Sequence, residues 1–154
     1  MFLDISEEVE IVEEKKFLGS FNSYAHDLSG DIYSHGEDEI IIENLIYDGK
    51  GPDAFFWFGR DGNPPISRKP SLNGILIPYP FEGEFPEAFD KNAKPLPAFN
   101  GETVVLKLPD DLKVSDLKWV SVWCRKFQHN FGDLVLNKNM ENTGKFLWLC
   151  YKLY

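Results

Sequence analysis

Residues 119–133 read WVSVWCRKFQHNFGD, an aromatic-rich segment that alternates in the manner of a β-strand. Successive side chains of a strand point to opposite faces of its sheet. Cys124 therefore shares one face with the two valines of the segment, whereas both tryptophans lie on the other face. We expect Trp123 and these valines to anchor a central strand, beside a neighbouring strand that carries Phe55 and Trp57.

The rest of the chain is a series of similar short segments, rich in apolar and β-branched residues and separated by glycine and proline turns. The expected strands lie at 17–24, within 29–36, and at 39–47, 54–59, 74–77, 103–108, 117–127, 131–136 and 146–153. This pattern predicts an all-β domain: an antiparallel β-sandwich or barrel-like fold of about eight or nine strands with little helix. The helix candidates are residues 6–16 and a turn near 86–90.

Two proline-rich segments, 61–73 and 78–100, interrupt the strands and are expected to be loops. Loops of this length within a compact domain are often functional or mobile. Simple decoration of the surface is the alternative interpretation.

Composition excludes several classes of partner. The chain has 154 residues, 43% of them hydrophobic and 15% aromatic, which is typical of a folded domain with a real core. Its formal net charge of −9 argues against nucleic acid and against anionic membranes, because both are bound mainly through Lys and Arg. No apolar run is long enough for a transmembrane helix, so we expect no membrane insertion. The acidic start, MFLDISEEVEIVEE, does not have the pattern of a signal peptide.

Four blocks of sequence carry a resemblance to a known family. They are the segment 119–133 together with SYAHDLSGDIY (23–33), YDGKGPDAFFWFG (47–59) and LPAFNGETVVLKLP (96–109). In this order they resemble the DM-thirteen domain, also called the electron-transfer DM domain, as in Skeletor-type and Knickkopf-type proteins. The resemblance divides the chain into an acidic N-terminal extension (1–16), a DM-thirteen-like β domain (17–136) and a C-terminal strand extension (137–154) expected to pack on that domain.

The resemblance implies a non-enzymatic module of an extracellular or cell-surface protein, with electron transfer through the single strand cysteine, Cys124. It implies neighbouring DOMON-type or cytochrome-type domains as partners, and this chain would be an excised mature domain. A haem or metal cofactor is compatible with this role, although the sequence requires none. The alternative is a carbohydrate or cuticle-matrix binding domain that stacks polysaccharide on exposed rings of Trp57, Trp119 and Trp123. A thiol- or metal-dependent enzyme is a third interpretation.

The sequence leaves three states open for Cys124. It could form a disulfide with Cys150, both cysteines could be buried thiols, or Cys124 could be a reactive thiol. A reactive thiol needs a nearby cation, and Lys126 shares its strand face whereas Arg125 points to the other. His129, between Gln and Asn, is expected to be a polar residue at the end of the strand.

Acidic residues suggest one further site. Asp48, Asp53 and Asp61 flank the glycine-rich segment and could converge on a calcium ion, because calcium prefers carboxylate and carbonyl oxygens. Their spacing does not match the EF-hand loop. Aspartates that cap tight turns explain the same residues equally well.

Overall fold

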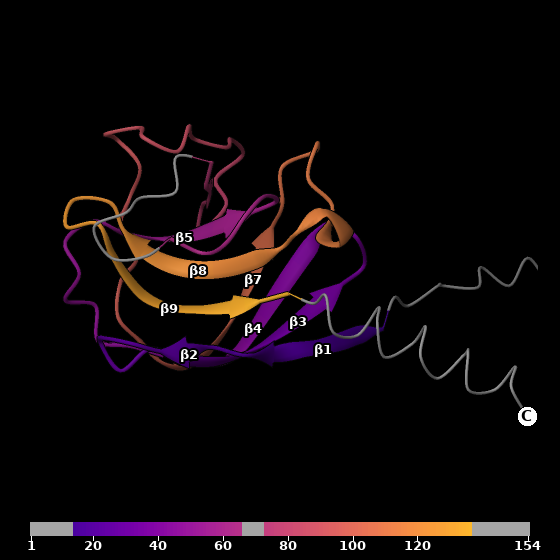
Figure 1. The fold of residues 1–154 in the computed structure, drawn as a ribbon, viewed down its shortest axis with the longest axis horizontal. Coiled ribbons are helices and arrows are strands. Elements are labelled where there is room, and N and C mark those ends of the chain that lie inside the picture. The colour runs from indigo at the N-terminus through magenta and orange to yellow at the C-terminus, as the bar shows by residue number, and fades with distance from the viewer. Residues whose placement is uncertain (1–13, 66–72, 137–154) are drawn as a thin grey trace, which may run out of the picture.

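The computed structural model describes residues 14–65 and 73–136 as two antiparallel β-sheets packed face to face (Figure 1). The first sheet has the strand order β1-β3-β4-β7, and the second has the order β2-β9-β8-β5-β6. The strands are β1 (Lys15–Ser20), β2 (Asn22–Ser23), β3 (Ser29–His35), β4 (Glu39–Tyr47), β5 (Ala54–Gly59), β6 (Ile75–Ile77), β7 (Phe99–Lys107), β8 (Trp119–Cys124) and β9 (His129–Val135). A single 3-10 turn, η1 (Val114–Asp116), precedes β8. The predicted all-β sandwich is confirmed.

Several expected strands have the predicted bounds, and the departures have local causes. Strands β4 and β5 begin and end where the sequence placed them. Strand β8 ends three residues before Phe127, because the chain turns back and Gln128 adopts a φ of 51°. Lys15 and Lys16, at the end of the helix candidate, belong to β1. The expected strand at 146–153 lies outside the described residues.

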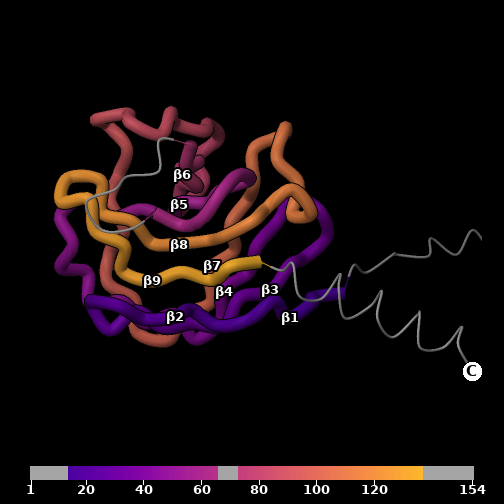
Figure 2. Tube along the Cα trace, in the orientation of Figure 1, coloured from indigo at the N-terminus to yellow at the C-terminus, as the bar shows by residue number. Residues whose placement is uncertain are grey.

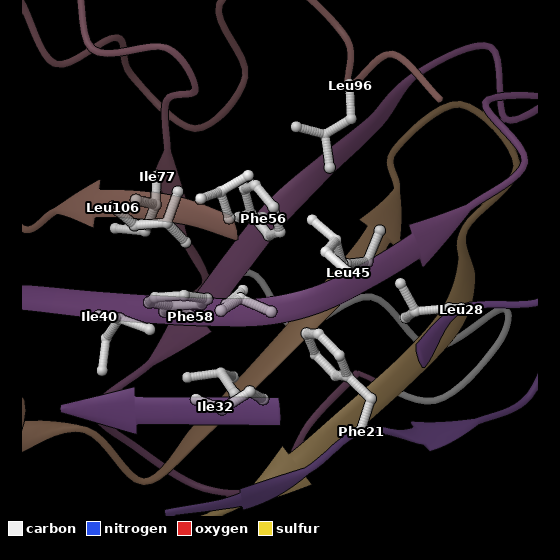
Figure 3. Close-up of a cluster of buried hydrophobic side chains, with 14 of the residues drawn as sticks. Phe21, Leu28, Ile32, Ile40, Leu45, Phe56, Phe58, Ile77, Leu96 and Leu106 are labelled. Carbon is white, nitrogen blue, oxygen red and sulfur yellow. The ribbon is translucent and has the colours of Figure 1, made fainter. Parts of the chain in front are cut away.

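The main core fills the space between the two sheets, where inward side chains of both layers meet (Figure 3). Ile32 of β3 and Ile40 of β4 are completely buried against Phe56 and Phe58 of β5. Burying such a side chain stabilises the fold by about 1.5–3 kcal/mol. Cys124 belongs to this same core cluster together with both valines of β8, so the face that they share is the inward one.

A second apolar cluster lies on the outer face of β5 and β8. It contains Phe55, Trp57, Leu76, Trp119 and Trp123. The long segment between β6 and β7 passes over these strands (Figure 2), and its Ala88 and Ala93 pack against the cluster. Strand β5 is therefore buried on both faces, which explains why its sequence, AFFWFG, is apolar without alternation.

The described residues contain no helix that is long and apolar enough to cross a membrane.

Candidate functional site

Cys124 is the last residue of β8, and its side chain is 0% exposed. Its cross-strand partners are Ala54 on β5 and His129 on β9. Among the described residues Cys124 is a free thiol. Cys150 lies outside them, so the predicted disulfide is not tested. The structure adds one fact to the three states left open by the sequence, which is that the Cys124 side chain is buried.

Tyr47, at the end of β4, lies close to Cys124 at the same end of the sandwich. Its ring is 2% exposed, and its hydroxyl oxygen accepts a hydrogen bond of 2.9 Å from the backbone N–H of Gly51. Burial raises the pKa of Tyr47, and the negative charges of Asp48 and of an ionised Cys124 would raise it further. The phenol is therefore protonated at neutral pH, beside a sulfur atom that is shielded from water.

Phe131 connects Tyr47 to two histidines. Its ring centroid lies 6.0 Å from that of Tyr47, 4.1 Å from that of His26 and 5.2 Å from that of His129. Phe131 is the unpaired residue of a β-bulge. Val122 pairs with Gly132 and Trp123 pairs with Asn130, which leaves Phe131 without a partner on β8. The bulge turns the Phe131 ring into the core, where it is 2% exposed. We call Cys124, Tyr47, His26, Phe131 and His129 the Cys124 cluster.

A hydrogen-bonded carboxylate holds His26 in place. Nδ1 of His26 lies 2.9 Å and 3.1 Å from the two carboxylate oxygens of Asp48. The Asp48 carboxylate also accepts a hydrogen bond from the backbone N–H of Lys50. Partial desolvation opposes ionisation of Asp48, but the hydrogen bonds from Lys50 and His26 outweigh it, so the pKa of Asp48 is lowered. His26 and Asp27 have φ values of 59° and 56°, a left-handed conformation that non-glycine residues rarely adopt.

The glycine-rich turn after β4 packs directly on this cluster. A Cβ atom added to Gly51 would lie 2.6 Å from the Phe131 ring and 2.6 Å from the Tyr47 hydroxyl. Gly49 has a φ of +74°, and a Cβ there would meet the backbone of Ala98 at 2.7 Å. Glycine is required at Gly51 because the backbone covers the Tyr47 phenol, and at Gly49 because of its positive φ and its close approach to Ala98.

Arg125 does not activate the thiol, as its opposite strand face predicted. Its guanidinium binds both carboxylate oxygens of Asp53, at 3.0 Å and 3.2 Å, and its third nitrogen donates to the carbonyl oxygens of Ala88 and Asp90 at 2.9 Å. It also lies 4.1 Å from the centre of the Phe55 ring. Arg125 therefore ties the covering segment between β6 and β7 to the end of β8.

Lys126, the cation expected on the face of Cys124, lies in the turn after β8. Its side chain is exposed, with the ammonium 5.7 Å from the centre of the Phe127 ring. It thus does not share a strand face with the buried thiol.

The three aspartates of the calcium hypothesis have separate partners. Asp53 binds Arg125, Asp48 binds His26 and caps the turn at Lys50, and the backbone carbonyl of Asp61 accepts a bond of 2.9 Å from the Trp119 indole. Within 14–65 and 73–136, no group of three or more His, Cys, Asp or Glu side chains could hold a metal ion. The turn-capping interpretation describes Asp48 better.

The three tryptophans of the carbohydrate hypothesis are core residues. Trp57, Trp119 and Trp123 are 1%, 0% and 1% exposed. Trp123 pairs with Phe55 across β5 and β8, as predicted for the central strand. These rings offer no exposed platform for stacking a sugar, because the segment between β6 and β7 covers their face.

Sequence reasoning did not single out Tyr47, His26 and Phe131. A signal was present, since SYAHDLSG and YDGKGPDA are two of the blocks that carry the family resemblance. A haem iron or metal ion bound through Cys124 would need an open sulfur atom, and the buried side chain does not fit that requirement.

Comparisons with known proteins identify the family of the chain. The family model described as electron transfer DM13 matches residues 20–136, which include every residue of the Cys124 cluster. Protein Skeletor of Drosophila melanogaster, in isoforms B/C and in isoforms D/E, is 34% identical to the chain over 104 residues. The alignment covers 66% of this chain but 11% and 6% of those relatives, so the chain spans a small part of their length. No solved structure matches the chain significantly. The chain belongs to the electron transfer DM13 family.

Proposed function

We propose that this domain is a non-enzymatic electron-transfer module of a longer extracellular or cell-surface protein, with Cys124 as its redox residue. The observation that carries the proposal is the complete burial of the Cys124 thiol beside the Tyr47 phenol. Disulfide exchange, sulfenic acid formation and metal ligation all require another atom to reach the sulfur. Electron transfer does not, because an electron tunnels through intervening protein. A buried thiol among oxidisable rings therefore favours one-electron chemistry.

The proposed step balances as a coupled loss of one electron and one proton. The S–H bond of Cys124 would break, and the electron would pass to a strong one-electron oxidant in a neighbouring domain, such as a high-potential metal centre of a cytochrome-type domain, which would be reduced by one electron. The proton passes to the imidazole of His129, the residue directly opposite Cys124 on β9. The Tyr47 phenol is the adjacent group that can exchange a hydrogen atom with the cysteine radical. Return of the electron and the proton restores the thiol.

The alignment covers 11% and 6% of the two Skeletor relatives. A match to so small a part of a long protein supports the role of one domain within a multidomain protein. A DOMON-type neighbour and an extracellular setting are part of this proposal. The competing polysaccharide-binding role through Trp57, Trp119 and Trp123 is not favoured, because their rings are buried.

Flash oxidation of the purified chain tests the proposal. A photogenerated ruthenium(III) bipyridine complex removes one electron from the protein, and freeze-quench electron paramagnetic resonance records the radical. We expect a sulfur or phenoxyl radical that disappears in Cys124→Ser and changes its spectrum in Tyr47→Phe. Tyr33→Phe, on β3 of the same sheet as Tyr47 but outside the Cys124 cluster, is the matched control and should leave the spectrum unchanged. A radical confined to tryptophan in the wild type, and unaffected by Cys124→Ser, would overturn the proposal.

A further inference from the structure

A cavity of about 450 Å³ lies on the outer face of the second sheet, over β9 and beside β2. Its position follows from the register, because Asp133 and Val135 of β9 pair with residues on the outer face of β8. Tyr24 and Asp133 form its polar wall, and Pro64 and Val135 contribute apolar surface. His129 is common to this cavity and the Cys124 cluster, but the cavity opens to the opposite side of the sheet.

The Asp133 carboxylate is the one formal charge among the described residues that line the cavity. The residue is 7% exposed. One oxygen accepts a hydrogen bond of 3.1 Å from the Tyr24 hydroxyl, and the other accepts one of 2.8 Å from the Asn130 side-chain amide. Both donors are neutral, and each carboxylate oxygen keeps a further acceptor site. Within 14–65 and 73–136 no cation pairs with this largely buried carboxylate, and such a group favours a positively charged ligand.

The groups around Asp133 are held firmly. The Asn130 amide also donates to the carbonyl of Pro65 at 3.0 Å, and its oxygen accepts from the backbone N–H of Gly132 at 3.0 Å. Burial and the neighbouring Asp133 raise the pKa of Tyr24, so its hydroxyl stays protonated and continues to donate. The acceptor is therefore oriented before any ligand arrives.

The Tyr24 ring supplies the second recognition element. The residue is 59% exposed although its hydroxyl is fixed by Asp133. The face of an aromatic ring attracts a cation, and its surface also packs against an alkyl chain. Val135, 58% exposed, and Pro64 continue the apolar wall. Such a wall suits a straight methylene chain better than a sugar ring covered with hydroxyls.

We propose that this cavity binds a lysine side chain of a partner protein. The ammonium group contacts the Asp133 carboxylate, and the four methylenes lie along Tyr24, Pro64 and Val135. This site does not depend on the redox role of Cys124.

Amide chemical-shift titration of the ¹⁵N-labelled chain tests the site. The probe is Nα-acetyl-lysine methylamide, and the neutral comparison is the same compound acetylated on its side-chain nitrogen. We expect shifts at Asn130, Gly132 and Asp133, with millimolar affinity for the charged probe and at least tenfold weaker binding of the neutral one. Equal binding of both compounds would overturn the proposal, as would no shift with either. Tighter binding of glucosamine or N-acetylglucosamine would assign the cavity to a sugar and overturn it too.

Two variants and a control locate the interaction. Asp133→Asn keeps the size of the side chain and should weaken binding of the charged probe at least tenfold. Asp31→Asn is the matched control: Asp31 also accepts bonds from a hydroxyl and an amide, those of Ser20 and Asn44, but on the first sheet, so its loss should leave affinity unchanged. Tyr24→Ala changes a mostly exposed side chain and should fold normally, and it should also weaken binding of the charged probe. It therefore tests the site even if Asp133→Asn does not fold. Unchanged affinity in Tyr24→Ala would count against the site.

Discussion

Arg125 and Asp53 form a two-bond ion pair that joins the end of β8 to the residue just before β5. The side chains are 10% and 24% exposed, so the pair is shielded from water, and the same guanidinium holds two carbonyl oxygens of the covering segment. The planar fork of arginine matches this set of acceptors, and the single ammonium of lysine does not. Arg125 and Asp53 thus hold the segment between β6 and β7 in place over the second apolar cluster.

Arg125→Ala should lower the free energy of unfolding by about 2–4 kcal/mol, because it leaves the Asp53 carboxylate and two carbonyl groups without their donor. Arg125→Lys should recover less than half of this loss. The measurement is urea unfolding followed by tryptophan fluorescence. Arg60→Ala, which removes a more exposed pair with Asp111, is the control and should cost about 0–1 kcal/mol. Equal losses for the two alanine variants would contradict the role assigned to Arg125.

Cys124 should be unreactive in the folded protein, because its side chain is completely buried. In Cys150→Ser, which leaves one thiol in the chain, Ellman's reagent should detect no fast-reacting thiol under native conditions and one thiol after denaturation. The double variant with Cys124→Ser is the blank. A thiol that reacts in the native protein as fast as free cysteine would refute the burial on which the proposed redox role rests.

Gly51→Ala should destabilise the fold by about 3 kcal/mol, because the new methyl group would overlap the Phe131 ring and the Tyr47 hydroxyl. Gly62→Ala is the control, since a Cβ there meets nothing within 4 Å and only its φ of +64° is unfavourable. That strain should cost about 1 kcal/mol. Thermal melting of the two variants measures the difference, and a Gly51 variant as stable as the control would show that the turn moves aside.

Trp123→Ala should cost about 3–5 kcal/mol, the usual range for removing a fully buried aromatic side chain. Phe127→Ala is the control. Phe127 lies in the turn after β8 with its ring 61% exposed, so its loss should change stability by less than about 0.5 kcal/mol. Chemical denaturation of both proteins provides the measurement. A denaturation midpoint of Trp123→Ala that matched the wild type would contradict the burial of Trp123 in the second apolar cluster.

Acid should weaken the fold partly through Asp48. Its pKa is lower in the folded state than the ordinary 3.8, so the unfolded chain binds the proton more tightly. The stabilisation is fully present above pH 3.8 and is lost as the pH falls through the folded pKa. Asp48→Asn should therefore show a shallower loss of stability on acidification, followed by circular dichroism. An acid transition of the same slope in both proteins would mean that Asp48 does not contribute.

Local patterns in the sequence predicted much of the fold. The β-branched run EIIIENLIY and the apolar run AFFWFG begin and end as strands where they were expected. The alternation of residues 119–124 placed Cys124 on one face with the valines, and the structure turns this face toward the main core. The first result rests on β-branched and apolar runs bounded by turn residues, and the second rests on the two-residue period of a strand.

The residues of the candidate site could be predicted only in part from the sequence. Cys124 was identified, but its surroundings were assigned to Lys126, which is next but one in the chain. Tyr47 and Phe131, which share the core cluster of Cys124, and His26, which packs on Phe131, come from other strands and turns. The partner of Arg125 is likewise Asp53, 72 residues away.

The amino-acid sequence by itself determined most strand positions, the residues that share each face of β8 and membership of the family, because periodicity and motif order are properties of the chain. Only the tertiary structure decided that both faces of β8 are buried, since a distant loop covers the face that carries Trp119 and Trp123. It also decided which side chains surround the thiol. Contacts between segments far apart in the sequence depend on how the sheets pair and on which loop covers them, and a local pattern holds no information about either.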